Sequence, residues 1–195
     1  MARAEEQAQQ LATADPAQWI TGQPEREADL AEEIVRWVYR LAQVGAWDVL
    51  DQYNPDSSGW DADVMLAWLR TAAATYATRI EQGTTEEVEA AAAEEDVPVA
   101  MAAVAAGLAA AATLHATTAA AEVVSFGGMD AARASGLTRK TWHTSSTNPR
   151  TSHAAQNGEA VDLGDVFSNG LRYPGDYAAG DVDETANCNC YLTYS

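Results

Sequence analysis

Apolar side chains recur with helical spacing in the first part of the chain. A stripe that repeats every 3.6 residues begins just after Glu27 and lies opposite charged residues, which predicts an amphipathic helix. Its members are Leu30, Ile34, Val38 and Leu41, widened by Trp37 and Val44. A second stripe predicts another helix over residues 60–80, ending at Gly83. Its members are Trp60, Val64, Trp68, Ala72, Tyr76 and Ile80.

Capping and turn signals divide the helical sequence that follows. Thr84 and Glu87 have the spacing of a capping box, which predicts a short third helix through the next alanines. A long alanine-rich helix is predicted over residues 100–124. Gly127-Gly128 is expected to end it, because glycine readily adopts the left-handed conformation found after a helix. A short helix over residues 129–134 follows.

The pattern changes after Gly136. Alternating or β-branched segments predict three strands, over residues 138–143, 159–163 and 190–194. Asn157-Gly158 is the strongest two-residue hairpin signal in the chain. The predicted fold class is therefore α+β, an N-terminal helical bundle followed by a small irregular antiparallel β unit.

The same pattern predicts the division of the chain. Asp15 and Pro16 are typical of a helix start, but residues 1–24 otherwise lack a long apolar stripe. They are predicted to form a loosely ordered leader, in which Trp19-Ile20 offers one small apolar anchor. A helical region over residues 25–136 and a C-terminal β unit over residues 137–195 complete the predicted organisation.

Acidic residues outnumber basic ones by a wide margin. The formal charge is −18, and residues 1–97 hold 20 acids against 6 Lys or Arg. Such a surface repels nucleic acid and anionic lipid unless positive charge is gathered locally. Residues 131–158 contain no acid, and they contain Arg133, Arg139, Lys140 and Arg150. This window, from Arg133 to Arg150, is where packaged DNA is an expected partner.

Composition also bears on membranes and targeting. With 195 residues, of which 47% are hydrophobic, the chain can fill one core or two small ones without disulfides. Residues 97–126 are apolar but consist mainly of Ala and Thr, which favours a buried helix over a membrane span. The polar start of the chain lacks the pattern of a signal peptide. The protein is therefore expected to be made in the cytoplasm and to have no membrane partner.

Both cysteines of the chain lie near its end, at Cys188 and Cys190. Residues i and i+2 of a strand share a face, so both sulfurs can meet one metal ion such as zinc, together with His153. His143 is a candidate for the fourth ligand. A disulfide between them would be strained, and it is disfavoured in cytoplasm. The third interpretation, which the sequence favours, is that both are buried thiols that fill space.

Arg150 and His153 form a second candidate site. An arginine can clamp a carboxylate or phosphate while an imidazole transfers a proton. Alternatively, Arg150 pairs with Asp176 or Glu184, and His153 hydrogen-bonds the backbone to fix an irregular loop. The second interpretation is favoured, and no residue is assigned a catalytic role.

A spaced series runs through the C-terminal part of the chain. It consists of Glu122, Lys140-x-Trp142, Arg150-x-x-His153, Gly158, Val161-x-Leu163, Phe167, Pro174-Gly175-Asp176, Glu184 and Asn187-Cys188-x-Cys190. This order resembles the phage Mu protein F-like (MuF) head morphogenesis family of tailed phages, over roughly residues 114–195. The resemblance implies a shared structural motif at Glu122, Trp142, Arg150, His153, Gly158, Pro174, Gly175, Asp176, Glu184, Asn187, Cys188 and Cys190.

The resemblance also implies a biological role. Family members are minor head proteins of the virion, encoded near the portal and capsid genes and linked to head assembly or DNA delivery. The portal or major capsid protein is thus the expected partner, and the head interior is the expected location. This chain departs from the family at Asn148, where an acid is common, and at Asn189, where arginine is usual. Some relatives carry Cys-x-x-Cys in place of Arg150-x-x-His153, which adds weight to the metal interpretation.

Two other function classes stay open. One is an enzyme, either a capsid maturation protease or an effector delivered into the host, for which a cysteine paired with His153 is the best available nucleophile. The other is a scaffold-like internal protein that works through its acidic half alone. A chain truncated at Gly136 would then still enter heads.

Overall fold

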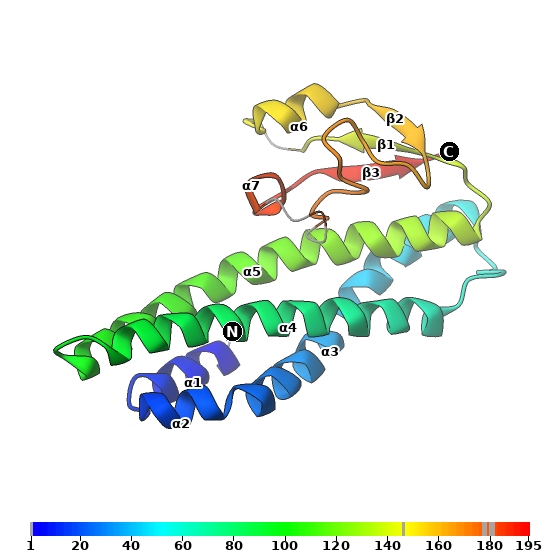
Figure 1. Ribbon diagram of the computed structural model, residues 1–195. Helices are drawn as coiled ribbons and strands as arrows, with labels where there is room; N and C mark the ends of the chain where they lie inside the picture. The colour runs from blue at the N-terminus through cyan, green and yellow to red at the C-terminus, as the bar shows by residue number, and fades with distance from the viewer. Residues whose placement is uncertain (1, 146, 177–178, 180–181) are drawn as a thin grey trace. The chain divides into compact units, whose positions relative to one another are not determined.

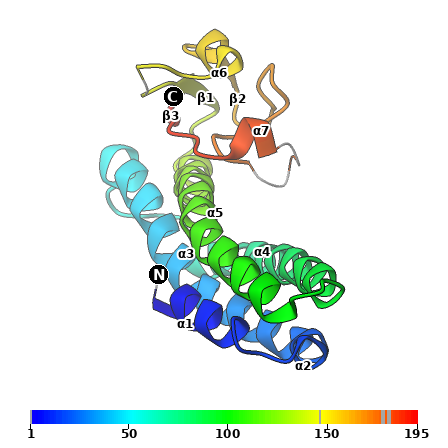
Figure 2. The same cartoon turned by 90° about the vertical axis from the view of Figure 1, so that its left-hand side faces the viewer.

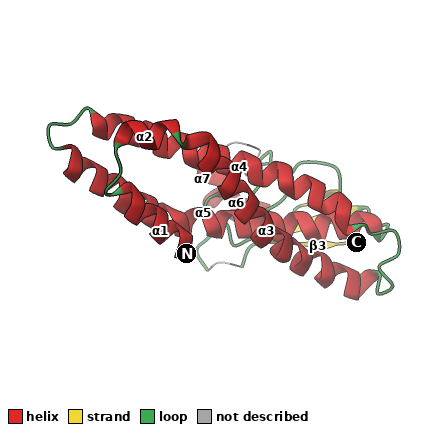
Figure 3. Ribbon diagram, turned by 90° about the horizontal axis from the view of Figure 1, so that it is seen from below, coloured by secondary structure: helices red, strands yellow, loops and turns green. Residues whose placement is uncertain are grey.

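The computed structural model describes residues 2–145, 147–176, 179 and 182–195. It confirms the α+β class, with long helices followed by three short strands (Figures 1 and 3). The helices are α1 (Ala2–Leu11), α2 (Pro16–Thr21), α3 (Gln23–Tyr53), α4 (Ala62–Ala92), α5 (Val97–Ala134), α6 (Thr151–Gln156) and α7 (Val182–Thr185). The strands are β1 (Arg139–His143), β2 (Ala160–Asp162) and β3 (Tyr191–Tyr194).

Backbone contacts divide the chain into two units, each built from segments distant in sequence. Unit 1 is Met1–Arg36 with Arg70–His115, and unit 2 is Trp37–Leu69 with Ala116–Ser195. These limits differ from the predicted borders after residues 24 and 136. The reason is that each of the long helices α3, α4 and α5 is divided between the units. One end of each helix belongs to unit 1 and the other end to unit 2.

The core of unit 1 includes the leader. Leu11 of α1 and Trp19 of α2 are buried in one cluster with side chains of α4 and α5. The buried partners are Val88, Ala91, Met101 and Ala105. Each short helix supplies a single large anchor. The sequence indicates Trp19 as such an anchor, and the structure buries it together with Leu11.

Polar contacts fix the leader as well. Asp15 accepts a hydrogen bond from the backbone N–H of Gln18 at 3.1 Å, which confirms the predicted helix start at Asp15-Pro16. The guanidinium of Arg26 lies 4.0 Å from the centre of the Trp19 ring and donates to the Trp19 carbonyl at 2.6 Å. Its Nε also donates to Glu81 Oε2 at 3.0 Å. Arg26 therefore joins α2 to α4 within unit 1.

Helix α4 is continuous where the sequence predicts an end and a new start. Gly83 lies inside α4, and a Cβ added there would meet nothing within 4 Å. Thr84 Oγ1 donates to the Ile80 carbonyl at 2.8 Å instead of capping a new helix. The capping-box prediction is wrong because a threonine hydroxyl can be satisfied inside a helix by the carbonyl four residues earlier.

In unit 2, α3 and α5 approach each other closely at two glycines. A Cβ on Gly45 would lie 2.0 Å from the Val124 carbonyl oxygen, and a Cβ on Gly127 would lie 2.0 Å from the Ala42 carbonyl oxygen. The prediction that Gly127-Gly128 ends the long helix is therefore wrong. Helix α5 continues to Ala134, and these glycines allow two backbones to touch.

This close approach shifts the buried face of α3. Trp37 and Val44, which the predicted stripe includes, are 61% and 62% exposed. The buried side is narrower and rich in small residues: Val38, Ala42, Gly45, Ala46, Val49 and Leu50. Hydropathy alone predicts that Trp37 is buried. Close contact between two helices instead buries the residues with the smallest side chains. On α4 the predicted member Val64 is likewise 62% exposed, while Met65 is buried.

The three strands form an antiparallel sheet in the order β2-β1-β3. All three predicted strands are confirmed, with ends shifted by one residue at most. In the central strand β1, Lys140 and Trp142 point to the same buried side. Figure 2 shows the strands gathered with α6 and α7 in one group. Tyr194 fastens this group to α5, because its hydroxyl donates to the Ser125 carbonyl at 3.4 Å.

Asn157-Gly158 forms a turn but not the predicted two-residue hairpin. Helix α6 lies between β1 and β2, and the turn follows it. Asn157 has φ −59° and ψ 115°, Gly158 has φ 88°, and the Glu159 N–H donates to the Gln156 carbonyl at 2.7 Å. These values describe a type II turn, whose third position favours glycine. The Gly158 N–H also donates to the Trp142 carbonyl at 2.8 Å and so joins the turn to β1.

Candidate functional site

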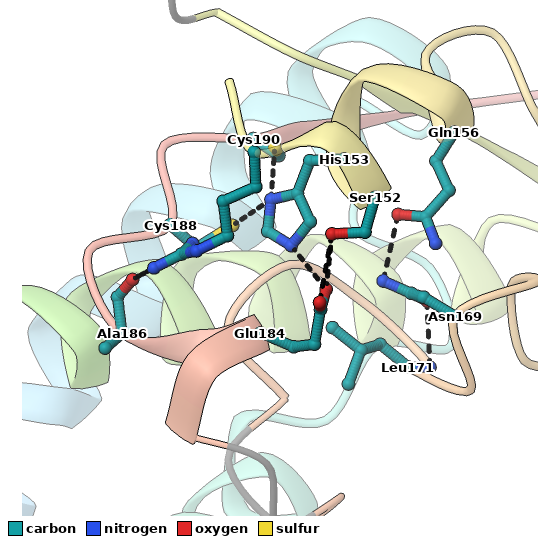
Figure 4. Close-up of polar contacts among 10 residues, drawn as sticks. Ser152, His153, Gln156, Asn169, Leu171, Glu184, Ala186, Cys188 and Cys190 are labelled. Atoms are coloured by element: carbon teal, nitrogen blue, oxygen red, sulfur yellow. Dashed lines mark hydrogen bonds and ion pairs between the residues drawn. The ribbon is translucent and has the colours of Figure 1, made fainter. Parts of the chain in front are cut away.

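Two sulfurs and one imidazole meet inside unit 2. Nδ1 of His153 lies 3.8 Å from Cys188 Sγ and 3.4 Å from Cys190 Sγ (Figure 4). These three ligand atoms all lie within 4.8 Å of one another. His153 and Cys188 are buried, and Cys190 is half-buried. The structure thus brings together the three residues that the sequence singles out as possible metal ligands.

Two short segments position these side chains. His153 lies on the first turn of α6, where the Ala154 N–H donates to the Arg150 carbonyl at 2.8 Å. The cysteines lie in the segment between α7 and β3. Asn187 precedes them with φ 52°, a left-handed conformation that asparagine tolerates better than most residues. After this turn both sulfurs face the same ring nitrogen.

Glu184 of α7 occupies the other side of the imidazole. Its Oε2 lies 3.2 Å from His153 Nε2, within ion-pairing distance. Nε2 is nevertheless a buried atom without an aligned hydrogen bond among the described residues. The Ser152 hydroxyl lies 3.0 and 2.9 Å from the two oxygens of Glu184, to which it donates. Glu184 therefore connects α7 to two successive residues of α6 (Figure 4).

Arg150 makes a different contact from those predicted. Its Nη2 donates to the Ala186 carbonyl, so it joins the start of α6 to the end of α7. Asp176 is bound by Arg172 instead, and Glu184 is bound by Ser152 and His153. These contacts differ from the prediction that Arg150 pairs with Asp176 or Glu184. They also differ from the prediction that His153 hydrogen-bonds the backbone. The interpretation that Arg150 fixes an irregular loop agrees with its bond to the backbone.

Aromatic side chains wall off the cluster. The Trp142 ring meets His153 edge to face at 5.4 Å and Phe167 at 5.1 Å between ring centres. Trp142, Phe167, Leu171 and Cys188 form one buried group, against which Cys190 packs. Trp142 is fully buried, so the imidazole and the sulfurs lie beside a low-dielectric wall.

The three side chains of the cluster shift one another's pKa. The Cys188 sulfur beside the ring raises the pKa of His153, and burial opposes that increase. The Cys190 thiol facing Cys188 lowers the pKa of Cys188, again against the effect of burial. The contact with the Cys188 sulfur raises the pKa of Cys190, and burial adds to that increase. The two thiols and the imidazole therefore influence one another's protonation.

This arrangement suits metal binding better than nucleophilic catalysis. The order thiol, imidazole and carboxylate resembles a catalytic triad in outline. However, Cys188 is only 3% exposed, and Cys190 is half-buried against the same aromatic group. A nucleophile has to be both ionised and accessible. Two thiols and an imidazole that share one centre are instead a ligand set that zinc prefers.

A second group of motif residues meets α5. Gly175 has φ 78°, and a Cβ added to it would lie 2.8 Å from the Glu122 backbone nitrogen. Pro174 and Asp176 on either side are buried, as is Glu122. The motif Pro174-Gly175-Asp176 therefore seats a loop directly on the backbone of α5, where only glycine fits.

Arg172 holds this loop in shape. Its Nε and Nη2 donate to the two carboxylate oxygens of Asp176 at 2.8 and 2.7 Å. The Arg172 backbone N–H donates to the same carboxylate at 3.0 Å. Sequence reasoning overlooked Arg172, although its spacing of four residues from Asp176 is a usable signal.

The contacts of two further polar residues were also not predicted. Ser152 was not expected to hold Glu184. Lys140 is 1% exposed, and its ammonium donates to the Arg172 carbonyl at 2.7 Å and lies 5.2 Å from the centre of the Phe167 ring. The alternation of β1 places Lys140 and Trp142 on one face, which is the signal that was available. Burial lowers the pKa of Lys140 to about 8.

The basic window does not form one positive surface. Lys140 is buried, and Arg150 is engaged with a backbone carbonyl. Arg133 and Arg139 keep about half of their side chains exposed, and each lies 3.9 Å from an acid, Asp130 and Asp162 respectively. Among the described residues no helix is long and apolar enough to cross a membrane.

Known proteins add no identification to this geometry. No family model, curated protein or solved structure matches the chain. The resemblance to the MuF family consequently stays a prediction based on the residues named above.

Proposed function

We propose that the chain is a minor head protein of a tailed phage, of the MuF-like head morphogenesis type. It would act as a virion component inside the head, near the portal, in capsid assembly or in DNA packaging and delivery. Its partner would be the portal protein or the major capsid protein. The C-terminal motif would serve as architecture that holds this docking component in shape.

One observation carries the proposal. The residues that the resemblance selects lie where separate segments of unit 2 are joined. His153 and Glu184 join α6 to α7, and the cysteines bring the segment before β3 to the same ring. Gly175 rests on the α5 backbone. Residues that join segments in this way keep the surface of unit 2 in one shape. Such a role suits an assembly protein, because its partner recognises a fixed surface.

The charge distribution supports the same role. With a net charge of −18 the chain repels DNA over most of its surface, and the basic window offers only Arg133 and Arg139 as exposed cations. Tight binding to duplex DNA requires several neutralised phosphates. We therefore expect the protein to sit near packaged DNA without binding it tightly, and to contact portal or capsid protein instead.

Virions offer the direct test. Mass spectrometry of purified, nuclease-treated particles from the phage that encodes this chain should detect it in few copies per head, with portal protein. Particles made with an amber mutation in its gene should show a defect in head assembly or in DNA delivery. Absence from wild-type particles, or tight binding to duplex DNA at roughly physiological salt of 0.15 M, would contradict the proposal.

A second candidate function is an enzyme, either a capsid maturation protease or an effector delivered into the host. The observation in its favour is the linear order of Cys190, His153 and Glu184, with gaps of 3.4 and 3.2 Å. A Cys190→Ser variant separates the two functions. If the variant folds and assembles normally but leaves capsid proteins uncleaved or the host unaffected, the enzyme is favoured. If cleavage and host effects persist, catalysis by Cys190 is excluded.

A further inference from the structure

We propose that His153, Cys188 and Cys190 bind one zinc ion, with Glu184 positioning the histidine from its far side. This inference goes beyond the head-protein proposal and does not depend on it. It concerns the ion that unit 2 holds, whichever partner the protein has.

The distances match a tetrahedral centre. With Zn–S bonds of about 2.3 Å and a Zn–N bond of about 2.0 Å, neighbouring ligand atoms lie about 3.6 Å apart. The two sulfur to Nδ1 distances are 3.8 and 3.4 Å. All three atoms fall within 4.8 Å of one another. An ion placed between them reaches each ligand with small adjustments of the side chains.

A shared metal ion explains why two sulfurs approach the same ring nitrogen. Nδ1 of an imidazole carries either one proton or one lone pair, and it can therefore direct one good hydrogen bond. Cys188 and Cys190 both approach this single atom. A cation that accepts the lone pair of Nδ1 and binds both sulfurs uses all three contacts at once.

Glu184 sets the tautomer that a metal requires. Metal-bound histidines usually give their second N–H to a carboxylate or carbonyl, which fixes the ring. Glu184 Oε2 stands 3.2 Å from Nε2, the nitrogen that faces away from the sulfurs. A proton on Nε2 is attracted to Glu184 and leaves the lone pair of Nδ1 directed at the cysteines. Ser152 holds the carboxylate in place with hydrogen bonds at 3.0 and 2.9 Å.

Charge balance also favours zinc. Two thiolates, a neutral imidazole and Zn²⁺ sum to no net charge, and binding releases the thiol protons to solvent. A neutral centre avoids the large cost of burying an isolated charge beside Trp142 and Phe167. Soft thiolate ligands further select against Mg²⁺ and Ca²⁺.

Three protein ligands leave a fourth position of the tetrahedron for a water molecule. Glu184 cannot supply it without leaving His153, since it lies at the opposite ring nitrogen. Cys190 is the more exposed of the two sulfur ligands, so a water molecule can complete the tetrahedron from its side. The ion would tie the start of β3 to α6, a link that otherwise depends on weak contacts between sulfur and nitrogen.

The first experiment measures metal content. Protein purified without chelator from zinc-supplemented cells should contain about one zinc ion per chain, as measured by mass spectrometry of the elements. Cys190→Ser, which keeps the size of a half-buried side chain, should lose that zinc. His143→Ala is the matched control, because His143 lies on β1 and contacts Thr193 and Tyr191 instead of the sulfurs. It should keep the zinc.

A second measurement does not depend on how variants fold. Wild-type protein stripped of metal should bind Co²⁺ with a thiolate-to-cobalt charge-transfer band, and zinc should displace the cobalt. Glu184→Gln should still bind, with about 10- to 100-fold lower zinc affinity. Zinc should also protect Cys190 from alkylation by iodoacetamide in the wild-type chain.

Three results would overturn the assignment. One is wild-type protein with no more zinc than Cys190→Ser. Another is cobalt binding without the charge-transfer band. The third is equal loss of zinc in His143→Ala. None of these results bears on the head-protein proposal, which the virion experiments test separately.

Discussion

The core of unit 1 and the group around His153 in unit 2 are held together in different ways. In unit 1 the buried cluster consists of Leu11, Trp19 and aliphatic side chains from long helices. In unit 2 the cluster around Trp142 adjoins buried polar groups, among them Lys140, His153 and Asp176. Each of these polar groups makes a small number of definite contacts. The structure of the first region depends mainly on how much apolar surface is buried. The structure of the second also depends on contacts between particular polar atoms.

This difference predicts where the chain tolerates change. Volume-conserving swaps among aliphatic residues typically cost less than about 1.5 kcal/mol. Removing one partner of a buried polar contact costs more, because the other partner stays buried and unsatisfied. Substitutions near His153 should therefore be more damaging than comparable ones in the helices of unit 1.

The largest effect is expected at Trp142. Trp142→Ala removes a fully buried ring that touches both His153 and Phe167, and it should lower the free energy of unfolding of the strands by about 3–5 kcal/mol. Trp37→Ala is the matched control, since Trp37 is 61% exposed and should cost less than about 1 kcal/mol. Native-state hydrogen exchange of β1 and β3 measures both. Equal costs would contradict the claim that the buried ring of Trp142 specifies this part of unit 2.

The next effect compares two glycines of α5. Gly127→Ala places a methyl group 2.0 Å from the Ala42 carbonyl oxygen and should destabilise unit 2 by about 3 kcal/mol. Gly107→Ala meets nothing within 4 Å and should stabilise the helix by about 0.5–1 kcal/mol. Thermal unfolding of the two variants should move in opposite directions. If both variants are stabilised, the backbones of α3 and α5 do not touch.

A smaller effect is expected at Asp176. Asp176→Asn keeps the size of a buried side chain but weakens three hydrogen bonds with Arg172, at a cost of about 2 kcal/mol. The exposed pair of Asp162 and Arg139, 3.9 Å apart, provides the contrast. Asp162→Asn should change stability by less than about 1 kcal/mol. Urea denaturation of both variants decides, and similar costs would contradict a special role for the buried pair.

The smallest effect is a pH dependence due to Lys140. Its folded pKa of about 8 lies below the usual lysine value of 10.5, so between these values the unfolded chain binds more protons. Stability due to this group therefore rises with pH across that window, by about 1 kcal/mol from pH 7 to 9. Lys140→Met should lack this rise. Denaturation of wild type and variant at both pH values measures it, and parallel slopes would argue against a buried ammonium.

Sequence periodicity predicts the helices well and their ends poorly. The amphipathic stripe after Glu27 identifies α3, and β-branched alternation identifies the strands. The predicted breaks at Gly83 and Gly127-Gly128 fail because glycine has two uses, termination and close packing, that look alike in sequence. Only the position of a second helix, here the Ala42 carbonyl beside Gly127, distinguishes them.

The candidate site shows the opposite balance. The spacing of Cys188 and Cys190 and the choice of His153 as their neighbour can be read from the chain, and the three meet. The role of Arg150 cannot, because its partner is the Ala186 backbone, which any residue could supply. A contact between a side chain and the backbone cannot be predicted from the pattern of side chains. A contact among rare side chains such as cysteine and histidine can.

His153 is the point at which the C-terminal segments of unit 2 are held together. Hydrogen exchange of His153→Ala, read peptide by peptide, tests this directly against His143→Ala. We predict that amides of β1 and β3 lose protection in His153→Ala alone, while α1, α2 and the rest of unit 1 keep theirs. Unchanged protection of the strands in His153→Ala would contradict the account.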